Sequence, residues 1–167
     1  MNDLFAPAVE KRELFFVVPG EVRGKGRPRF RVIKPKSGGE FVSTYTDAAT
    51  KKYEAQIAQY AAVAKGQARW RMVGLPEEGD VNPTVLRLDL EAVFLIPVSR
   101  SKKIRAGLDG KLAVNRIDGD NVIKACLDAM QNIIFADDKV VAVMTCTKRW
   151  TADSAKECLK VKVSTCE

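Results

Sequence analysis

Three aspartates and a lysine in the second half of the chain have the types and spacing to bind a metal ion and an anion. Asp118 and Asp120 are separated by one residue, and Lys124 follows four residues after the second of them. Asp138 comes later, after a short apolar run. Carboxylates suit a hard cation such as Mg²⁺, which one or two carboxylates hold while water and phosphate oxygens complete its shell. In a chain with a formal net charge of +7, such a cluster of acids indicates a site.

The apolar residues around these acids predict a helix. From Val122 onward they fall on one face, and Asp120, Lys124 and Asp128 fall together on the opposite face at ~100° per residue. Either Asp120 or Asn121 could cap this helix, because a short side-chain oxygen can accept a free N–H of the first turn. The Lys124 ammonium lies one turn beyond Asp120, so we expect it to reach back to that carboxylate.

A return of the chain after this helix would bring Asp138 beside Asp118 and Asp120. We expect these three carboxylates to bind Mg²⁺, with Lys124 at the rim and Mn²⁺ as a possible substitute. Asp137 is either a support for these ligands or an alternative ligand. The competing interpretation is structural, because an aspartate at a helix start is commonly only a cap and an Asp-Asp pair before a strand is commonly only a turn.

The composition excludes several other kinds of site. The chain of 167 residues has no histidine, which removes Ser-His and Cys-His nucleophilic sites and histidine-bound zinc. Its four cysteines form no Cys-x-x-Cys pair, so a zinc knuckle is not expected. No apolar run approaches the ~18 residues of a transmembrane helix, and the start of the chain lacks the pattern of a secretory signal.

A basic stretch near the start of the chain is a candidate DNA-binding surface. Residues 23–36 contain seven basic residues and no acid, and the sequence pI is about 9.3. Glycines and prolines interrupt this stretch, and Phe30 and Val32 alternate with arginines, which predicts an edge strand with one cationic face. Arginine binds phosphate oxygens in a bidentate manner, so we expect DNA contacts from Lys25, Arg27, Arg29 and Arg31. The competing interpretation is a solvated charged edge that prevents aggregation.

A second basic stretch, residues 97–110, predicts a short turn or helix. The sequence leaves DNA contact and plain solvation equally open for it.

The remaining pattern predicts a single α+β domain over residues 13–167, after a loose tail at residues 1–12. We expect strands at 14–18, 41–45 and 84–96, a helix from Thr46 or Asp47 to about Lys65, and a strand pair at 140–150 and 157–163 joined by a turn and running antiparallel. This order predicts a mixed, largely antiparallel sheet with the two main helices packed on one face. Trp70, in the irregular segment after the first helix, is expected to anchor its loop.

The acidic motif resembles that of a known family. Residues 118–141 contain Asp118-x-Asp120-Asn121-x-x-Lys124-Ala125-x-x-Asp128-Ala129, then Asp137-Asp138-x-x-Val141. This pattern is similar to the signature of the RusA family of Holliday junction resolvases. The upstream run from Gly24 to Phe30 resembles a subset of that family. The chain departs from the family pattern at Ile117, where proline is usual, and at Val140, where glutamine is usual, which puts substrate preference in doubt more than the metal site.

The resemblance implies a small, metal-dependent, homodimeric endodeoxyribonuclease that cuts four-way DNA junctions in DNA recombination and repair. The catalytic residues would be Asp118, Asp120, Lys124 and Asp138, with the lysine essential. No organic cofactor and no membrane partner are implied, and the protein would be cytoplasmic, in a bacterium, and encoded by a phage or prophage. The alternative is a basic dimer that binds DNA junctions without cutting them. Its sequence preference and the number of metal ions stay open.

Overall fold

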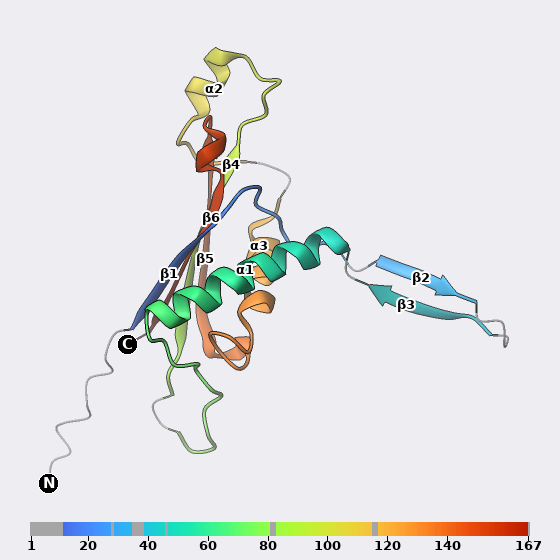
Figure 1. The fold of residues 1–167 in the computed structure, drawn as a ribbon, viewed down its shortest axis with the longest axis vertical. Helices are drawn as coiled ribbons and strands as arrows, with labels where there is room; N and C mark the ends of the chain where they lie inside the picture. The colour runs from blue at the N-terminus through green and yellow to red at the C-terminus, as the bar shows by residue number, and fades with distance from the viewer. Residues whose placement is uncertain are drawn as a thin grey trace, which may run out of the picture.

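The core of the fold is a four-stranded sheet in the order β1-β6-β4-β5 (Figure 1). The computed structural model describes residues 12–27, 29–34, 39–45, 47–80, 83–114 and 117–166. The strands are β1 (Glu13–Pro19), β4 (Leu86–Leu95), β5 (Val141–Thr151) and β6 (Cys158–Thr165). β6 pairs antiparallel with both β1 and β4, whereas β4 and β5 are parallel. The predicted mixed, largely antiparallel sheet is confirmed.

Alternation along the strands places one face of this sheet in the core. In β1, Leu14, Phe16 and Val18 are buried while the residues between them are exposed. In β4, Leu86 and Leu88 follow the same rule, as the sequence predicts. Side chains at every second position of a strand share a face, so this inner face is continuous across the sheet.

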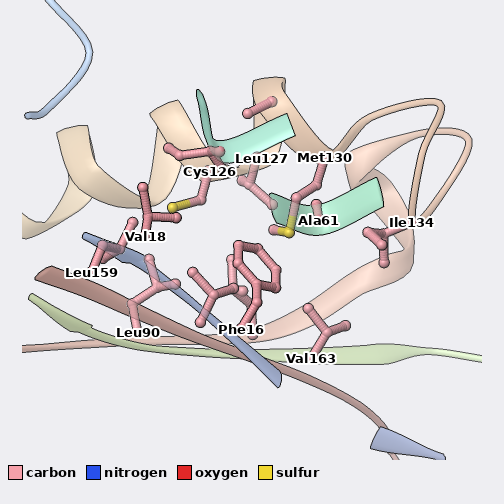
Figure 2. Packing of buried hydrophobic residues seen from close by; sticks show 14 of the residues in the cluster. Phe16, Val18, Ala61, Leu90, Cys126, Leu127, Met130, Ile134, Leu159 and Val163 are labelled. Atoms are coloured by element: carbon pink, nitrogen blue, oxygen red, sulfur yellow. The ribbon is translucent and has the colours of Figure 1, made fainter. Parts of the chain in front are cut away.

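Two helices, α1 (Ala48–Gln67) and α3 (Gly119–Met130), cover that inner face and contact each other. Asp47 caps α1 by accepting hydrogen bonds from the N–H groups of Ala49 and Thr50, which confirms one of the two predicted caps. Figure 2 shows Ala61 from α1 and Met130 from α3 meeting over the strand residues of the core. The prediction of two main helices on one face is therefore confirmed.

Two parts extend from this body. The strands β2 (Arg29–Ile33) and β3 (Phe41–Tyr45) form a separate antiparallel pair that projects from the start of α1 (Figure 1). At one end of the main sheet, residues 97–114 form a lobe around the short helix α2 (Lys102–Leu108). We call these parts the β2–β3 arm and the α2 lobe. Two short 3₁₀ helices, η1 (Asp138–Val140) and η2 (Ser154–Lys156), precede β5 and β6.

One pairing differs from the prediction. The strands β5 and β6 were expected to form a pair, and they do run in opposite directions, but β4 lies between them and pairs with both. β4 and β6 are the two inner strands of this sheet, and each pairs with a neighbour on both of its edges.

The anchoring role expected for Trp70 is confirmed. The Trp70 side chain is buried, and its Nε1 donates a hydrogen bond of 3.1 Å to the carbonyl of Ile134. None of the helices in the described ranges is long and apolar enough to cross a membrane. The predicted tail at residues 1–12 lies, apart from Arg12, outside the residues that the structure describes.

Candidate functional site

The start of α3 carries the first two candidate ligands. The helix begins at Gly119, so Asp118 occupies the cap position rather than Asp120 or Asn121. The Asp118 backbone carbonyl accepts hydrogen bonds from the N–H groups of Asn121 and Val122, but its carboxylate makes no capping hydrogen bond. The carboxylates of Asp118 and Asp120 are both on the exposed side of this turn. The predicted cap was therefore wrong by two or three residues, and the Asp118 carboxylate makes no capping hydrogen bond to the helix.

Asp120 and Lys124 form the contact that the helical spacing predicts. The Lys124 Nζ donates a hydrogen bond of 3.2 Å to Asp120 Oδ2, and both side chains are exposed. This hydrogen bond is the main cause that lowers the pKa of Asp120 below the ordinary value of an aspartate. The carboxylate therefore stays ionised to lower pH, which a metal ligand requires.

Strand β5 supports the turn that carries the acids. A Cβ on Gly119 would lie 3.5 Å from the Cβ of Cys146, so the helix start rests directly on this strand. Two residues further along β5, Lys148 Nζ donates a hydrogen bond of 2.9 Å to the carbonyl of Ile117, immediately before Asp118. The sequence analysis did not identify Lys148 as part of the site. Alternation along the predicted strand, which puts Cys146 and Lys148 on the same face, was the available signal.

The Gly24-Lys25-Gly26 segment crosses α3 and α1 at close range. A Cβ on Gly24 would lie 2.9 Å from the Cβ of Asn121, and the Lys25 N–H donates a hydrogen bond of 2.8 Å to the Asn121 carbonyl. A Cβ on Gly26 would lie 2.8 Å from Oδ2 of Asp47, the cap of α1. Glycine is the residue that permits such an approach of backbone to neighbouring atoms. The β2–β3 arm therefore begins beside the first turn of α3.

Of the four predicted DNA-binding residues, Lys25 has a partner within the fold. Its Nζ forms an ion pair with Asp128, one helical turn beyond Lys124 on α3. Arg27 and Arg31 are exposed, and no carboxylate partner for either is found among the described residues. Arg29 begins β2. The role of the four residues in DNA binding stays a prediction, but for Lys25 the structure adds a contact that ties the base of the arm to α3.

The structure does not bring Asp138 beside the other two acids. α3 is about 18 Å long at ~1.5 Å per residue, and its first turn lies over Cys146 in the middle of β5. Asp138 belongs to η1, which immediately precedes the first residue of β5, so it lies toward the C-terminal end of α3 and away from its first turn. The chain does return after α3, but Asp138 lies only at the start of β5 and does not reach the first turn of α3.

Asp137 and Asp138, the two adjacent acids at η1, differ in their contacts. Asp137 caps η1 by accepting a hydrogen bond of 3.0 Å from the Lys139 N–H, and this bond is the main cause that lowers the pKa of Asp137. Asp138 is exposed. Within the described ranges, no group of three or more acids or cysteines is arranged to hold a metal ion. In the single chain, the candidate ligands are therefore Asp118 and Asp120, a pair of exposed oxygen donors of the kind that Mg²⁺ accepts together with water and phosphate.

A cavity elsewhere on the molecule does not coincide with these acids. It has a volume of about 880 Å³ and lies along the segment that follows Trp70, with Arg12, Thr84 and Thr165 on its other sides. None of the candidate acids lines it. Asp118 and Asp120 therefore lie on the exposed surface and not in this cavity.

The chain was also compared with known protein families. The family model described as endodeoxyribonuclease RusA matches residues 19–163 of the chain. That range includes the Gly24-Lys25-Gly26 segment, the β2–β3 arm, the α2 lobe and α3. A search of curated proteins gave no match. Because the matched range is nearly the whole chain of 167 residues, the protein belongs to the RusA family of endodeoxyribonucleases.

Proposed function

We propose that this protein is a Mg²⁺-dependent endonuclease that resolves four-way DNA junctions, with Asp118 and Asp120 as its metal ligands. Family membership gives the endodeoxyribonuclease activity on Holliday junctions. The observation that supports the finer proposal is the start of α3, where two exposed carboxylates lie beside Lys124 and beside the base of a cationic arm.

Each residue of this cluster has a distinct task in the proposal. Asp118 and Asp120 bind the cation through carboxylate oxygens. A bound Mg²⁺ would lower the pKa of an attacking water and offset charge on the phosphate in the transition state. Lys124 exchanges its contact with Asp120 for a contact with a phosphate oxygen of the substrate, and its fixed charge stabilises the same developing charge. Lys148 and Asn121 position the turn, because they hydrogen-bond the segments on either side of it.

The proposal includes a homodimer. A four-way junction is resolved by two cuts on strands related by symmetry, and a two-fold dimer supplies two identical sites in that relation. Sedimentation of the purified protein tests this part separately, since a monomer at the concentration of the cleavage assay would contradict it.

The decisive experiment is a cleavage assay on a mobile four-way junction and on a linear duplex of the same sequence, with Mg²⁺, Mn²⁺ or EDTA. Wild type is expected to cut the junction in paired, symmetrical positions only when metal is present. Asp120→Asn is expected to abolish cutting and keep junction binding. Asp153→Asn is the matched control, because Asp153 is exposed, caps η2 and is replaced by an equally good cap. Equal cutting by Asp120→Asn and wild type would refute the metal site.

Asp138→Asn in the same assay decides the third ligand. Cutting that survives would limit the ligands to Asp118 and Asp120, as the single chain suggests. Cutting lost to the extent seen for Asp120→Asn, with an unchanged melting temperature, would mean that the working complex brings Asp138 to the metal.

A second function has one observation in its favour. Because no group of three ligands is gathered within the described ranges, a dimer that binds junctions without cutting them remains a candidate. Tight junction binding by wild type with no cutting under any metal would establish that function and refute the nuclease.

A further inference from the structure

The surface cations of this protein fall into two classes, those that face a carboxylate and those that do not. Over the sheet, the arm tip and α3, most of them form ion pairs within the fold: Lys25–Asp128, Lys34–Glu40, Arg87–Asp89, Lys124–Asp120, Arg149–Glu91, Lys160–Glu91 and Lys162–Glu13. A paired surface cation has much of its charge neutralised locally. An external anion should gain the most binding energy from cations that have no such partner.

The α2 lobe is rich in cations of the second class. Residues 97–114 contain five basic residues and one acid. The acid and one of the bases hold the lobe to the body of the protein: Asp109 Oδ1 accepts a hydrogen bond of 2.8 Å from the Ala152 N–H, and Arg105 donates one of 2.8 Å to the Ala152 carbonyl. The only acid of the lobe is therefore used at its base.

Four cations of the lobe stay unneutralised. They are exposed, and the part of the chain that the structure describes offers none of them a carboxylate partner: Arg100, Lys102, Lys103 and Lys111. Lys102 and Lys103 stand in the first turn of α2, where no acid is present. Positive charge there opposes the helix dipole, so these lysines do not stabilise the helix that carries them.

The lobe is joined to the turn that carries Asp118. Its returning segment lies against β5, where the Ala113 N–H donates a hydrogen bond of 2.8 Å to the Lys148 carbonyl and the Trp150 N–H donates one of 2.9 Å to the Lys111 carbonyl. Lys148 in turn holds the Ile117 carbonyl. The lobe and the candidate acids therefore share one strand as their support.

The lobe and the arm lie on different sides of α3. Figure 1 shows the β2–β3 arm extending to one side of the body and the α2 lobe rising at the end of the sheet, with α3 between them. A DNA duplex bound along the arm alone would leave the lobe uncovered. A substrate with more than one duplex segment can reach both.

We propose that the α2 lobe is a second DNA-binding surface, which contacts the phosphate backbone of a duplex segment other than the one that follows the β2–β3 arm. This inference rests on the proposed action on branched DNA. Lysines contact phosphate as point charges, so the contact is independent of sequence and carries no base readout. It orients a branched substrate across the acids at the start of α3.

The test is the salt dependence of junction binding, measured by fluorescence anisotropy in EDTA so that nothing is cut. The slope of log K against log salt concentration reports the number of phosphates contacted, at about 0.9 per contact in duplex DNA. Lys102→Ala/Lys103→Ala is expected to make the slope shallower by up to about 2. The charge-preserving variant Lys102→Arg/Lys103→Arg is expected to retain the wild-type slope.

The matched control is Arg69→Ala/Arg71→Ala. These two arginines are also exposed and without a carboxylate partner in the described ranges, but they lie in the segment that leads from α1 to the start of β4, whereas the lobe follows the end of β4. They are expected to leave the slope unchanged. Because all the replaced side chains are exposed, the melting temperatures of the variants should match that of wild type. Arg100→Ala/Lys111→Ala provides a second pair from the lobe if α2 is disturbed.

The outcomes separate this inference from the proposed function. A wild-type slope in both lobe variants, or an equal change in the Arg69/Arg71 control, would overturn the lobe as a DNA-binding surface. The cleavage assay stands apart from this measurement. If the lobe variants change the slope as expected but the wild type never cuts, the nuclease is refuted and the lobe is established as a DNA-binding surface. If the wild type binds no DNA, both proposals are refuted.

Discussion

Gly24→Ala should disturb the site without touching any of its charged residues. The new Cβ would lie 2.9 Å from Asn121 Cβ and 3.3 Å from Ile117 Cγ2. Carbon atoms pack best at roughly 3.5–4.0 Å, so the first turn of α3 and the segment before the arm must separate by roughly 0.6 Å or more. Overpacking of this kind costs about 1–3 kcal/mol. At roughly 2–4 °C per kcal/mol for a chain of this size, the melting temperature should fall by about 2–12 °C.

The same displacement should also lower the rate of junction cutting, and this effect should be larger than the loss of stability. The hydrogen bond from the Lys25 N–H to the Asn121 carbonyl lies at this contact, and Asp118 and Asp120 immediately precede Asn121 at the start of the same helix. A catalytic group misplaced by about 1 Å can lose up to about a hundredfold in rate. The measurement is single-turnover junction cutting with Mg²⁺ at a temperature where the variant is fully folded, together with its thermal melt.

Gly66→Ala is the control for this prediction. Gly66 lies inside α1, and a Cβ there would meet nothing within 4 Å. Alanine is about 1 kcal/mol more favourable than glycine within a helix, so this variant should melt slightly higher than wild type and cut at the same rate. If Gly24→Ala melted and cut like wild type, the close contact between this segment and α3 would be refuted.

Three further predictions concern the body of the fold. Trp70→Phe removes the hydrogen bond to the Ile134 carbonyl and should lower the free energy of unfolding by about 1–3 kcal/mol, measured by urea denaturation. The hydrogen bond from the Arg87 guanidinium lowers the pKa of Asp89. The Asp89 carboxylate therefore contributes stability above its unfolded pKa, and this contribution is lost as pH falls through the lower folded pKa. Arg87→Met should reduce that loss in melting curves recorded below about pH 4. Burial raises the pKa of Cys126, so a thiol reagent at neutral pH should label it only after denaturation, and labelling in the native protein would contradict its burial.

Local patterns predicted the elements of this fold, and non-local pairing decided how they assemble. The alternation of Leu86, Leu88 and Leu90 gave a strand with one buried face, and the cap and spacing after Asp47 gave α1. The neighbours of each strand depend on contacts far apart in sequence, such as Leu90 with both Cys146 and Val161. No periodicity in one strand specifies these partners, which is why β5 and β6 were expected to pair directly.

The candidate site divides in the same way. The Asp120–Lys124 contact follows from helical spacing alone, and the structure contains it. The position of Asp138 depends on the path of the loop after α3, which helical spacing does not specify. The twelve residues of α3 separate Asp138 from Asp118, and the loop does not bring the two residues back together. Lys148 could not be assigned to the site from local patterns, because its hydrogen bond to Ile117 spans thirty-one residues of sequence.

Charge content and charge pairing lead to different conclusions about the basic surfaces. By content, the stretch at residues 23–36 is the strongest candidate for DNA binding, yet Lys25 and Lys34 within it face carboxylates of this chain. When ion pairing is counted as well, the α2 lobe is as strong a candidate as residues 23–36, because the single acid of the lobe, Asp109, accepts a hydrogen bond from Ala152. An ion pair on the surface contributes only about 0–1 kcal/mol, so a phosphate could displace Asp128 from Lys25 at little cost. Among the residues that the structure describes, no carboxylate pairs with the lobe lysines, so DNA should gain more from each of them than from each paired cation of the arm.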